Sequence, residues 1–296
     1  MKITVLGTNG LLSDCIGRYC NKHNHQLFMY GLNVPIGHTY DIFNQANLIN
    51  DDLNYDEIIQ SDMIVYAVGA GIQSNLKESA GLIYKLNVTV PVKICNELKL
   101  NGYKGDFISF GSYFEIGENS ENHCFTETEL LQSQRKVVND YSVSKRMFSR
   151  FISSVKMPFR TLHFILPTIY GENEAPHRLI PYTINALKSD AEIAFTSGEQ
   201  IRQYIYIDEL VEIVFNANSN TIPSGLYNIE GAETLTVKKL VSTLFAAFNK
   251  PLPKSVFGKT QRTDTGMKNL QINGQKLKQL IGKKPTIKII DVYDRY

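Results

Sequence analysis

Short apolar segments alternate with amphipathic, helix-length segments along the first half of the chain. The apolar segments lack the polar–apolar alternation of a strand with one wet face. Strands that are apolar on both faces are typical of a parallel sheet covered by helices on both sides. The expected strands are Ile3–Leu6, Gln26–Tyr30, Met63–Ala67, Phe107–Ser109 and Thr161–Leu166, and the expected helices are Leu11–Asn21, Leu76–Leu98 and Asn139–Ser154. The pattern predicts an α/β fold with a doubly wound parallel sheet.

The pattern changes after Pro167, where turn residues cluster and the later strands are short. A chain of 296 residues is long enough for about two domains. We expect a first domain over residues 1–166 and a smaller mixed α/β domain for the substrate over 167–296. The expected helices of the second part are Leu179–Lys188, Asp208–Ala217, Val237–Asn249 and Gly274–Leu280. Its expected strands, Ile201–Ile207 and Leu226–Ile229, are candidates for rejoining the first sheet.

Composition and charge exclude several classes of protein. Hydrophobic residues make up 43% and charged residues 20%, as in ordinary globular domains, and the net charge is only +2. So small a charge gives no reason to expect a nucleic acid or a membrane surface as partner. The apolar runs are too short to span a bilayer, and Met1-Lys2 leads directly into a strand, so we expect a cytoplasmic protein without a signal peptide. The four cysteines form no CxxC pair or zinc-ligand spacing, so we expect reduced thiols and no metal site.

A glycine-bearing turn directly follows the first expected strand and opens the first expected helix. It reads Gly7-Thr8-Asn9-Gly10-Leu11-Leu12-Ser13. Glycine lets the backbone turn tightly and approach a pyrophosphate, and the free N–H groups of a helix N-terminus favour phosphate. A plain tight turn is the alternative, but the position after the first strand of a βαβ pattern favours dinucleotide binding. The cofactor-binding candidates are Gly7, Asn9, Gly10 and Leu11.

The end of the second strand leaves the choice of cofactor open. A carboxylate there would favour NAD, and a nearby arginine would favour NADP. The chain has Tyr30-Gly31-Leu32-Asn33 instead, which supplies neither group. We therefore expect NADP or NAD as cofactor, with NADPH favoured over NADH.

A tyrosine and a lysine, Tyr141 and Lys145, stand one helical turn apart in an expected helix. Residues at i and i+4 share a helix face, so the phenol and the ammonium can point to one place. An unperturbed tyrosine has a pKa of about 10, and a nearby cation lowers that pKa. Such a phenol can exchange a proton near neutral pH, as carbonyl and alcohol chemistry requires. A solvated helix face is the alternative, and the preceding phosphate loop favours the catalytic interpretation.

Together, the loop and the Tyr/Lys pair resemble the extended short-chain dehydrogenases/reductases, in the nucleotide-sugar epimerase/dehydratase group. Further similar segments are Leu86-Asn87-Val88, Leu166–Gly171, Arg202–Asp208 and Tyr227-Asn228-Ile229. The resemblance implies a Rossmann-like fold, a nucleotide-diphosphate sugar as substrate, and a homodimer formed through the helices at Leu76–Leu98 and Tyr141–Arg150. It also implies cofactor contacts from Asp41, Ala67, Gly69, Asn87 and Lys145. For Asp41 the alternative is the N-cap of a helix at Ile42–Ala46.

Members of this family place a Ser or Thr at the end of the fifth strand, where it bonds the reacting sugar oxygen. Counted from the start of the strand, Ser112 takes this place; aligned on the following aromatic residue, Phe110 does, and Phe110 cannot donate a hydrogen bond. We expect Ser112 to be the catalytic hydroxyl, with Ser109 second, and a hydroxyl that only caps a turn is the alternative. The related 4,6-dehydratases carry an acid pair directly after this position. This chain does not, which favours a reductase or an epimerase over a dehydratase.

The resemblance also indicates residues for the substrate. Arginine matches the oxygens of a diphosphate with its planar fork, and Arg202 occupies the position of such an arginine in the family. Arg262 is a second candidate, and His177 or Arg178 lies in a stretch that often contacts substrate. Each of these side chains can instead be an ordinary surface group.

Two short segments, Leu179–Tyr182 and Thr196–Arg202, look most like the 4-ketoreductases of bacterial deoxysugar pathways, of the CDP-abequose synthase type. We therefore expect NAD(P)H-dependent reduction of the C4 keto group of a nucleotide-activated 4-keto-6-deoxyhexose, for deoxysugar and O-antigen biosynthesis. Two alternatives stay open. One is a nucleotide-sugar 4-epimerase that holds NAD tightly, and the other is a non-catalytic nucleotide-binding sensor.

Overall fold

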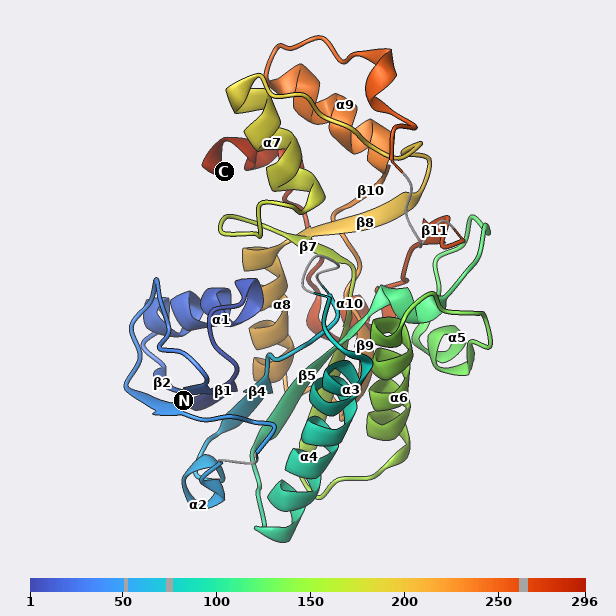
Figure 1. Cartoon of the computed structure of the whole chain (residues 1–296). Coiled ribbons are helices and arrows are strands. Elements are labelled where there is room, and N and C mark those ends of the chain that lie inside the picture. The colour runs from blue at the N-terminus through green and yellow to red at the C-terminus, as the bar shows by residue number, and fades with distance from the viewer. Residues whose placement is uncertain (51–52, 73–76, 261–265) are drawn as a thin grey trace.

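A seven-stranded sheet forms the centre of the computed structural model, which describes residues 1–50, 53–72, 77–260 and 266–296 (Figure 1). The strand order is β3-β2-β1-β4-β5-β6-β9, and every neighbouring pair is parallel. The strands are β1 Lys2–Leu6, β2 Gln26–Gly31, β3 Ile42–Gln45, β4 Met63–Tyr66, β5 Asp106–Ser112, β6 Arg160–Leu166 and β9 Gly225–Asn228. The order reverses between β1 and β4, so the doubly wound parallel sheet predicted from the sequence is confirmed.

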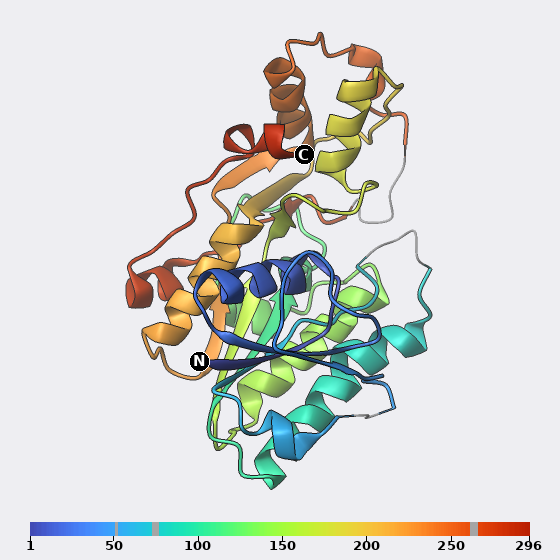
Figure 2. The ribbon, with the colours of Figure 1, turned by 90° about the vertical axis from the view of Figure 1, so that its left-hand side faces the viewer.

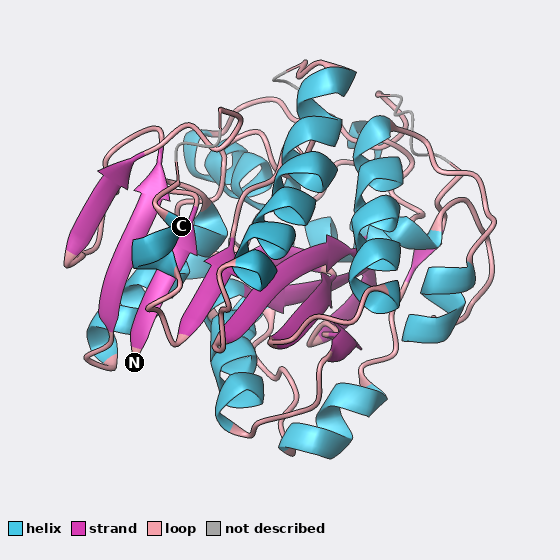
Figure 3. Cartoon of the chain, turned by 90° about the horizontal axis from the view of Figure 1, so that it is seen from below, coloured by secondary structure: helices cyan, strands magenta, loops and turns pink. Residues whose placement is uncertain are grey.

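Helices cover both faces of this sheet (Figure 3). They are α1 Leu11–Lys22 and α8 Ile207–Ser219 on one face, and α4 Val90–Leu100 and α6 Asp140–Ser154 on the other. Successive residues of β4 serve the two faces in turn, since Val65 packs in the core with α1 and α8, whereas Ile64 and Tyr66 pack in the core with α4 and α6. Both faces are therefore dry, which explains the continuous apolar strands. None of the helices in the described ranges is both long and apolar enough to cross a bilayer.

The C-terminal part of the chain builds a smaller mixed lobe beyond the carboxyl ends of the large sheet (Figures 1 and 2). Its strands are β7 Thr168–Tyr170, β8 Ile201–Tyr206, β10 Glu233–Thr236 and β11 Asn269–Leu270, and its helices are α7 Leu179–Ser189 and α9 Val237–Ala247. β8 pairs in parallel with β7 and β11 and antiparallel with β10. Of the two strands expected to rejoin the first sheet, β9 does so, whereas β8 belongs to the small sheet. The domain boundary at residues 166/167 stays a prediction.

Two segments differ from the helices considered for them. Residues 42–46 are not a helix: Ile42 and Phe43 begin β3, which pairs with β2. The expected helix over 76–98 is interrupted, with α3 at Ala80–Tyr84, a π-helical turn at Lys85–Thr89 and then α4. Pro91 has no N–H to donate to the carbonyl four residues earlier, which accounts for the irregular turn at that point. The expected start of the helix, Leu76, lies outside the described residues.

The remaining elements are short. The helices are α2 Tyr55–Ile58, α5 Glu127–Gln132 and α10 Gln275–Ile281, and the 3-10 turns are Tyr113–Ile116, Lys254–Val256, Ile289–Asp291 and Tyr293–Arg295. The turn at 113–116 directly follows β5 and carries residues of the site described next.

Candidate active site

The glycine-bearing turn lies at the carboxyl ends of β1 and β4. Gly7 has a φ of 111°, and a Cβ built on it would lie 2.7 Å from Val68 Cγ2, so a side chain does not fit there. Gly10 is the N-cap of α1, and Leu11 is the first residue of that helix. Ser13, in the place of the third glycine of the related pattern, accepts a hydrogen bond from Gly10 N at 2.9 Å and donates one to Gly10 O at 3.0 Å. The serine therefore closes the first helical turn without disturbing it.

The loop after β2 folds against this turn. Asn9, which has a left-handed φ of 58°, donates from Nδ2 to Val34 O (2.9 Å) and accepts from Ile36 N (3.0 Å). A Cβ built on Gly31 would lie 2.5 Å from Thr8 Oγ1. The Thr8 side chain thus fills the space that a larger residue at the end of β2 would need, which gives a physical reason why no carboxylate stands there.

Asp41 does not belong to this edge of the sheet, which corrects the expectation that it contacts adenine. It precedes β3, and its Oδ2 accepts a hydrogen bond from Leu27 N near the start of β2 at 2.6 Å. In a parallel sheet the starts of the strands lie at the edge opposite to their carboxyl ends. Asp41 therefore ties β3 to β2 on the side away from the glycine turn.

Asn87 joins the segment after β4 to α6. Its Oδ1 accepts from Ala70 N, and its Nδ2 donates to Ala70 O and to Ser144 Oγ, each at 2.9 Å. The side chain is buried and its amide is fully engaged. Asn87 therefore ties the segment after β4 to α6. A direct contact of Asn87 with the cofactor stays a prediction.

The backbone after β4 provides the cradle that a dinucleotide needs. Ala67 N donates to Leu6 O at 2.9 Å, which keeps this segment beside the glycine turn. A Cβ built on Gly69 would lie 3.3 Å from Ile72 Cδ1 and 3.9 Å from Lys145 Nζ. Bare backbone at Gly7 and Gly69 next to a lysine ammonium fits a nicotinamide dinucleotide, because phosphate and ribose require close approach to N–H groups and a hydrogen-bond donor.

Tyr141 and Lys145 converge at this edge, as their spacing on α6 predicts. Asn139 caps the helix by accepting a hydrogen bond from Ser142 N at 2.9 Å. Lys145 Nζ lies 5.9 Å from the centre of the Tyr141 ring and donates to Phe110 O at 2.9 Å. The glycine turn, the segment after β4 and the Tyr/Lys pair thus form one continuous site.

The protonation of this pair differs from the expectation. Burial raises the pKa of Tyr141 to about 12, and the neighbouring Ser112 hydroxyl only partly offsets this. Loss of solvation thus outweighs the groups that favour the phenolate, and a lowering of the phenol pKa by Lys145 stays a prediction. Burial also lowers the pKa of Lys145 to about 8. The phenol therefore keeps its proton throughout the neutral range, whereas the amine titrates close to it.

The structure separates the three candidates at the end of β5. Ser112 ends the strand, and its hydroxyl is close enough to the Tyr141 phenol to favour the ionised form of that phenol. Phe110 is 7% exposed and packs into the core, with its ring 6.4 Å from that of Phe164. Ser109 is buried three residues earlier, and its Oγ lies 2.8 Å from His163 Nδ1. Ser112 is thus the hydroxyl beside the phenol.

We expect Ser112→Ala to lower kcat about 10²-fold or more, the lower end of what a positioned hydrogen-bonding or proton-transfer group contributes. Ser109→Ala is the matched control, because its hydroxyl lies behind the site and its loss leaves the phenol's neighbours in place. Steady-state kinetics of keto-sugar reduction would measure both. Equal losses in the two variants would contradict the assignment of Ser112.

Arg178 is the substrate candidate that faces the Tyr/Lys pair. It is the N-cap of α7, and its charge is close enough to favour the ionised form of Tyr141. Its Nε pairs with Glu174 Oε1 at 2.6 Å, and its Nη2 donates to Ile169 O at 3.2 Å. The guanidinium is therefore held from two sides beside the phenol.

The other three substrate candidates are placed differently. His177 is exposed at the surface. Arg202 is buried on β8 in the small sheet, and its Nη1 donates to Ile201 O at 2.8 Å. Arg262 lies outside the described residues. A role of these residues toward a diphosphate stays a prediction.

Two buried carboxylates beside the site were missed in the sequence. Glu174 lies in the turn before α7 and pairs with Arg178 across four residues, and because this segment is not helical the sequence holds no periodic signal for the pair. Glu115 stands three residues after Ser112, and the two form a capping box in which Ser112 N donates to Glu115 Oε1 at 2.8 Å. The S-x-x-E pattern is the sequence signal for that arrangement. Within the described ranges, no three His, Cys, Asp or Glu side chains gather as metal ligands.

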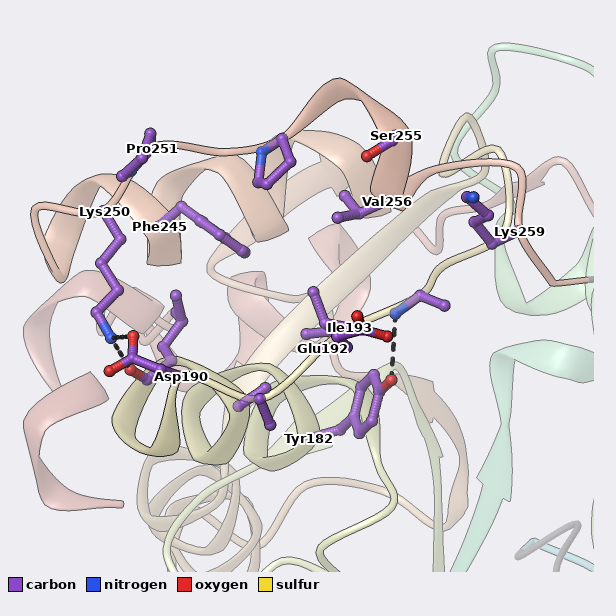
Figure 4. Close-up of a pocket in the computed structure, with 15 residues that line it drawn as sticks. Tyr182, Asp190, Glu192, Ile193, Phe245, Lys250, Pro251, Ser255, Val256 and Lys259 are labelled. Carbon is purple, nitrogen blue, oxygen red and sulfur yellow. Dashed lines mark hydrogen bonds and ion pairs between the residues drawn. The ribbon is translucent and has the colours of Figure 1, made fainter.

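A cavity of about 770 Å³ lies in the small lobe between α7, α9 and the segment 190–194 (Figure 4). Tyr182 and Ala186 line it from α7, and its charged side chains have both signs, because Asp190 and Glu192 stand beside Lys250 and Lys259 and Lys250 pairs with Asp190. Tyr182 stands one helical turn after Arg178, about 6 Å along the axis of α7, so one helix contributes to the cavity and to the charge around the phenol. The volume is in the range of small-molecule sites.

Comparison of the sequence with known proteins identifies relatives for most of the chain. The profile of the NAD dependent epimerase/dehydratase family matches residues 3–230. CDP-abequose synthase of Salmonella muenchen is 26% identical over 181 residues, which cover 59% of this chain and 56% of that protein. dTDP-4-dehydro-6-deoxyglucose reductase of Escherichia coli is 26% identical over 162 residues, which cover 52% of this chain and 50% of that protein. The matches thus span little more than half of each relative.

Solved structures share the fold over the whole chain. A dTDP-glucose 4,6-dehydratase from Streptomyces venezuelae with NAD and TYD bound has a TM-score of 0.83 at 16% identity, covering 100% of this chain and 95% of that one. A UDP-glucose 4-epimerase from Thermotoga maritima with UDP-glucose also has a TM-score of 0.83 at 16% identity, with coverages of 99% and 96%. At this identity the likeness shows the fold alone.

Proposed function

Because the chain belongs to the NAD dependent epimerase/dehydratase family, we propose that it reduces the C4 keto group of a nucleotide-activated 4-keto-6-deoxyhexose with NADPH or NADH. The observation that carries this proposal is the Ser112–Tyr141 contact in which the phenol keeps its proton. A phenol that keeps its proton can donate it to the alkoxide that forms as a keto group is reduced. Tyr113 and Phe114 stand where the related dehydratases carry their acid pair.

The residues around the phenol have distinct roles in this proposal. A nicotinamide cofactor held at the glycine turn and Lys145 would supply the hydride for the sugar C4. Tyr141 donates its proton to the oxygen as negative charge develops there, and Ser112 donates a hydrogen bond to the same oxygen. Lys145 holds a ribose hydroxyl and stabilises the phenolate left behind. Arg178 adds a positive charge that favours the phenolate.

We propose NADPH as the favoured cofactor. Gly31 ends β2 without a carboxylate, so nothing at that position repels a 2′-phosphate. Among solved structures of this fold, the dehydratase from Streptomyces venezuelae has NAD bound, so NAD is the alternative cofactor. Comparing kcat/KM for the two reduced cofactors tests the preference, and a higher value for NADH contradicts it.

The direct test is turnover with purified protein. CDP- and dTDP-4-keto-6-deoxyglucose are each incubated with NADPH or NADH, and cofactor oxidation is followed by absorbance. We expect stoichiometric oxidation and a 6-deoxyhexose product. Unchanged cofactor with both keto sugars contradicts the proposal. A protein that is purified with tightly held NAD and interconverts C4 epimers without net oxidation is instead the epimerase, since a reductase must exchange its cofactor at every turnover.

The cavity in the small lobe is proposed to hold the nucleoside end of the substrate. We expect Ala186→Trp, which fills the cavity from α7, to raise KM for the nucleotide sugar at least tenfold, because an indole and a nucleoside cannot share the space. KM for NADPH should stay unchanged, since the cofactor edge lies at the large sheet. Equal changes in both KM values would contradict the placement. Homodimerisation through α4 and α6 stays a prediction.

A further inference from the structure

Glu115 is a fully buried carboxylate behind the catalytic hydroxyl. Its Oε1 accepts from Ser112 N at 2.8 Å, while its Oε2 has no hydrogen-bond partner of good geometry among the described residues. A buried carboxylate with an unsatisfied oxygen is costly for folding, so its presence calls for a physical reason. Nothing in the proton transfer proposed above uses it.

A buried polar chain surrounds this carboxylate between β5, β6 and α6. Ser109 Oγ lies 2.8 Å from His163 Nδ1, and Ser149 Oγ lies 2.9 Å from His163 Nε2. The Ser149 hydroxyl is also close enough to Glu115 to favour its ionised form. A Cβ built on Gly111 would lie 2.6 Å from Glu115 Oε1 and 2.8 Å from His163 Nε2. Only glycine at 111 leaves room for both groups, so β5 is built to admit the carboxylate.

Four titratable or charged groups face Glu115 from the elements packed against it: Lys145, Arg146 and Tyr141 on α6, and His163 on β6, which is part of the same polar chain. Burial lowers the pKa of His163 to about 3, so the imidazole is neutral. Arg146 donates from Nε to Glu115 O and from Nη2 to Ile116 O and Ser133 Oγ, so none of these hydrogen bonds goes to the Glu115 carboxylate. Among these groups, Lys145 is the one whose protonation changes near neutral pH.

Glu115 and Lys145 act on each other through the protein without a direct salt bridge. Burial lowers the pKa of Lys145, and the negative charge of Glu115 partly opposes this, so that the pKa of Lys145 is about 8. Burial likewise raises the pKa of Glu115 to about 7, and Lys145 opposes that shift. Lys145 Nζ donates to Phe110 O at 2.9 Å, and Glu115 Oε1 accepts from Ser112 N at 2.8 Å, so both groups bond the backbone at the same end of β5. There each charge favours the ionised form of the other.

We propose that Glu115 is a positioning residue of the site: its carboxylate fixes the Ser112 end of β5 and supplies the negative charge that keeps the Lys145 amine protonated while the site works. The consequence for catalysis rests on the proposed function. The effect on the protonation of Lys145 does not, because it depends only on the two buried groups.

The test compares Glu115→Gln with wild type by the pH dependence of Lys145 labelling. Pulse acetylation with acetic anhydride, read at Lys145 by mass spectrometry, reports the free amine without any ligand. Glutamine keeps the acceptor for Ser112 N and removes the charge, so we expect the labelling midpoint to fall by about one pH unit. Glu121→Gln is the matched control, since Glu121 is exposed and pairs with Arg135. Its midpoint should equal that of wild type.

The same shift should appear in turnover, where the alkaline limb of kcat/KM moves to lower pH in Glu115→Gln by a similar amount. An unchanged labelling midpoint overturns the proposal, whatever happens to activity. Absence of turnover in wild type overturns the proposed function alone. The labelling result still tests whether Glu115 keeps Lys145 protonated. Should Glu115→Gln fail to fold, Ser149→Ala decides, because the Ser149 hydroxyl favours the ionised form of Glu115 and its loss makes that form less stable. Its midpoint should fall, and a wild-type midpoint overturns the proposal.

Discussion

Tyr141→Phe is expected to lower kcat for keto-sugar reduction by about 10²–10⁴-fold, the contribution typical of a positioned proton donor. The phenol is the group that Ser112 bonds and that Lys145 and Arg178 face. Phenylalanine keeps the ring, including its edge-on contact with Phe114 at 6.4 Å, so the fold of the site should survive. Affinity for NADPH, measured by its fluorescence in a titration, should change less than threefold.

The loss should also be insensitive to pH across the neutral range. Because the pKa of Tyr141 is raised to about 12, the wild-type phenol is protonated well above neutrality, and its removal costs the same at pH 6 as at pH 8. Activity within tenfold of wild type would show that another group donates the proton. Tyr84→Phe on the exposed end of α3, whose hydroxyl only bonds Asp140, is a suitable control.

Lys145→Met should have the second large effect, because the ammonium serves both the cofactor and the phenol. We expect kcat to fall about 10²-fold or more and KM for NADPH to rise by a similar factor. Methionine has nearly the same length and is apolar, so it fills the buried site without the cost of desolvating a charge. The thermal unfolding midpoint should therefore stay close to that of wild type. Lys99→Met on the exposed end of α4 serves as the control.

The pH profile gives this variant a second signature. The pKa of Lys145 is lowered to about 8, so the amine is charged below that pH and neutral above it. Wild-type kcat/KM should therefore decline as pH rises through about 8, and Lys145→Met should lack this limb. A wild-type alkaline limb that persists in the variant would assign it to a different group.

Local sequence patterns were enough to predict the glycine turn and the Tyr/Lys pair of the site. Gly7 and Gly10 follow a strand and open a helix, and this order places a glycine turn at the carboxyl end of β1 whatever happens elsewhere. Tyr141 and Lys145 share a face of α6 because they are one turn apart. The same reasoning failed for Asp41, because a short segment of Ile and Phe after an acid is equally compatible with a helix and with the edge strand β3.

The inner part of the site depends on contacts between distant segments. Glu115 meets Ser149 and the His163 chain only because β5, β6 and α6 pack together around Gly111. A capping-box pattern predicts that the Glu115 carboxylate bonds Ser112 N, but not that it is buried next to a lysine. The raised pKa of Tyr141 has the same origin, since burial is a property of the packed site.

The sequence by itself determined the parallel sheet, the glycine turn and the Tyr/Lys pair, because strand apolarity, glycine geometry and helical spacing are local properties. Tertiary structure alone decided that Ser112, not Ser109, meets the phenol, that Arg178, not His177, faces it, and that β9 rejoins the large sheet while β8 does not. It also decided the protonation states of Tyr141 and Lys145. These outcomes depend on which surfaces pack together and exclude water. Those surfaces come from residues far apart in the chain, so local sequence patterns do not determine them.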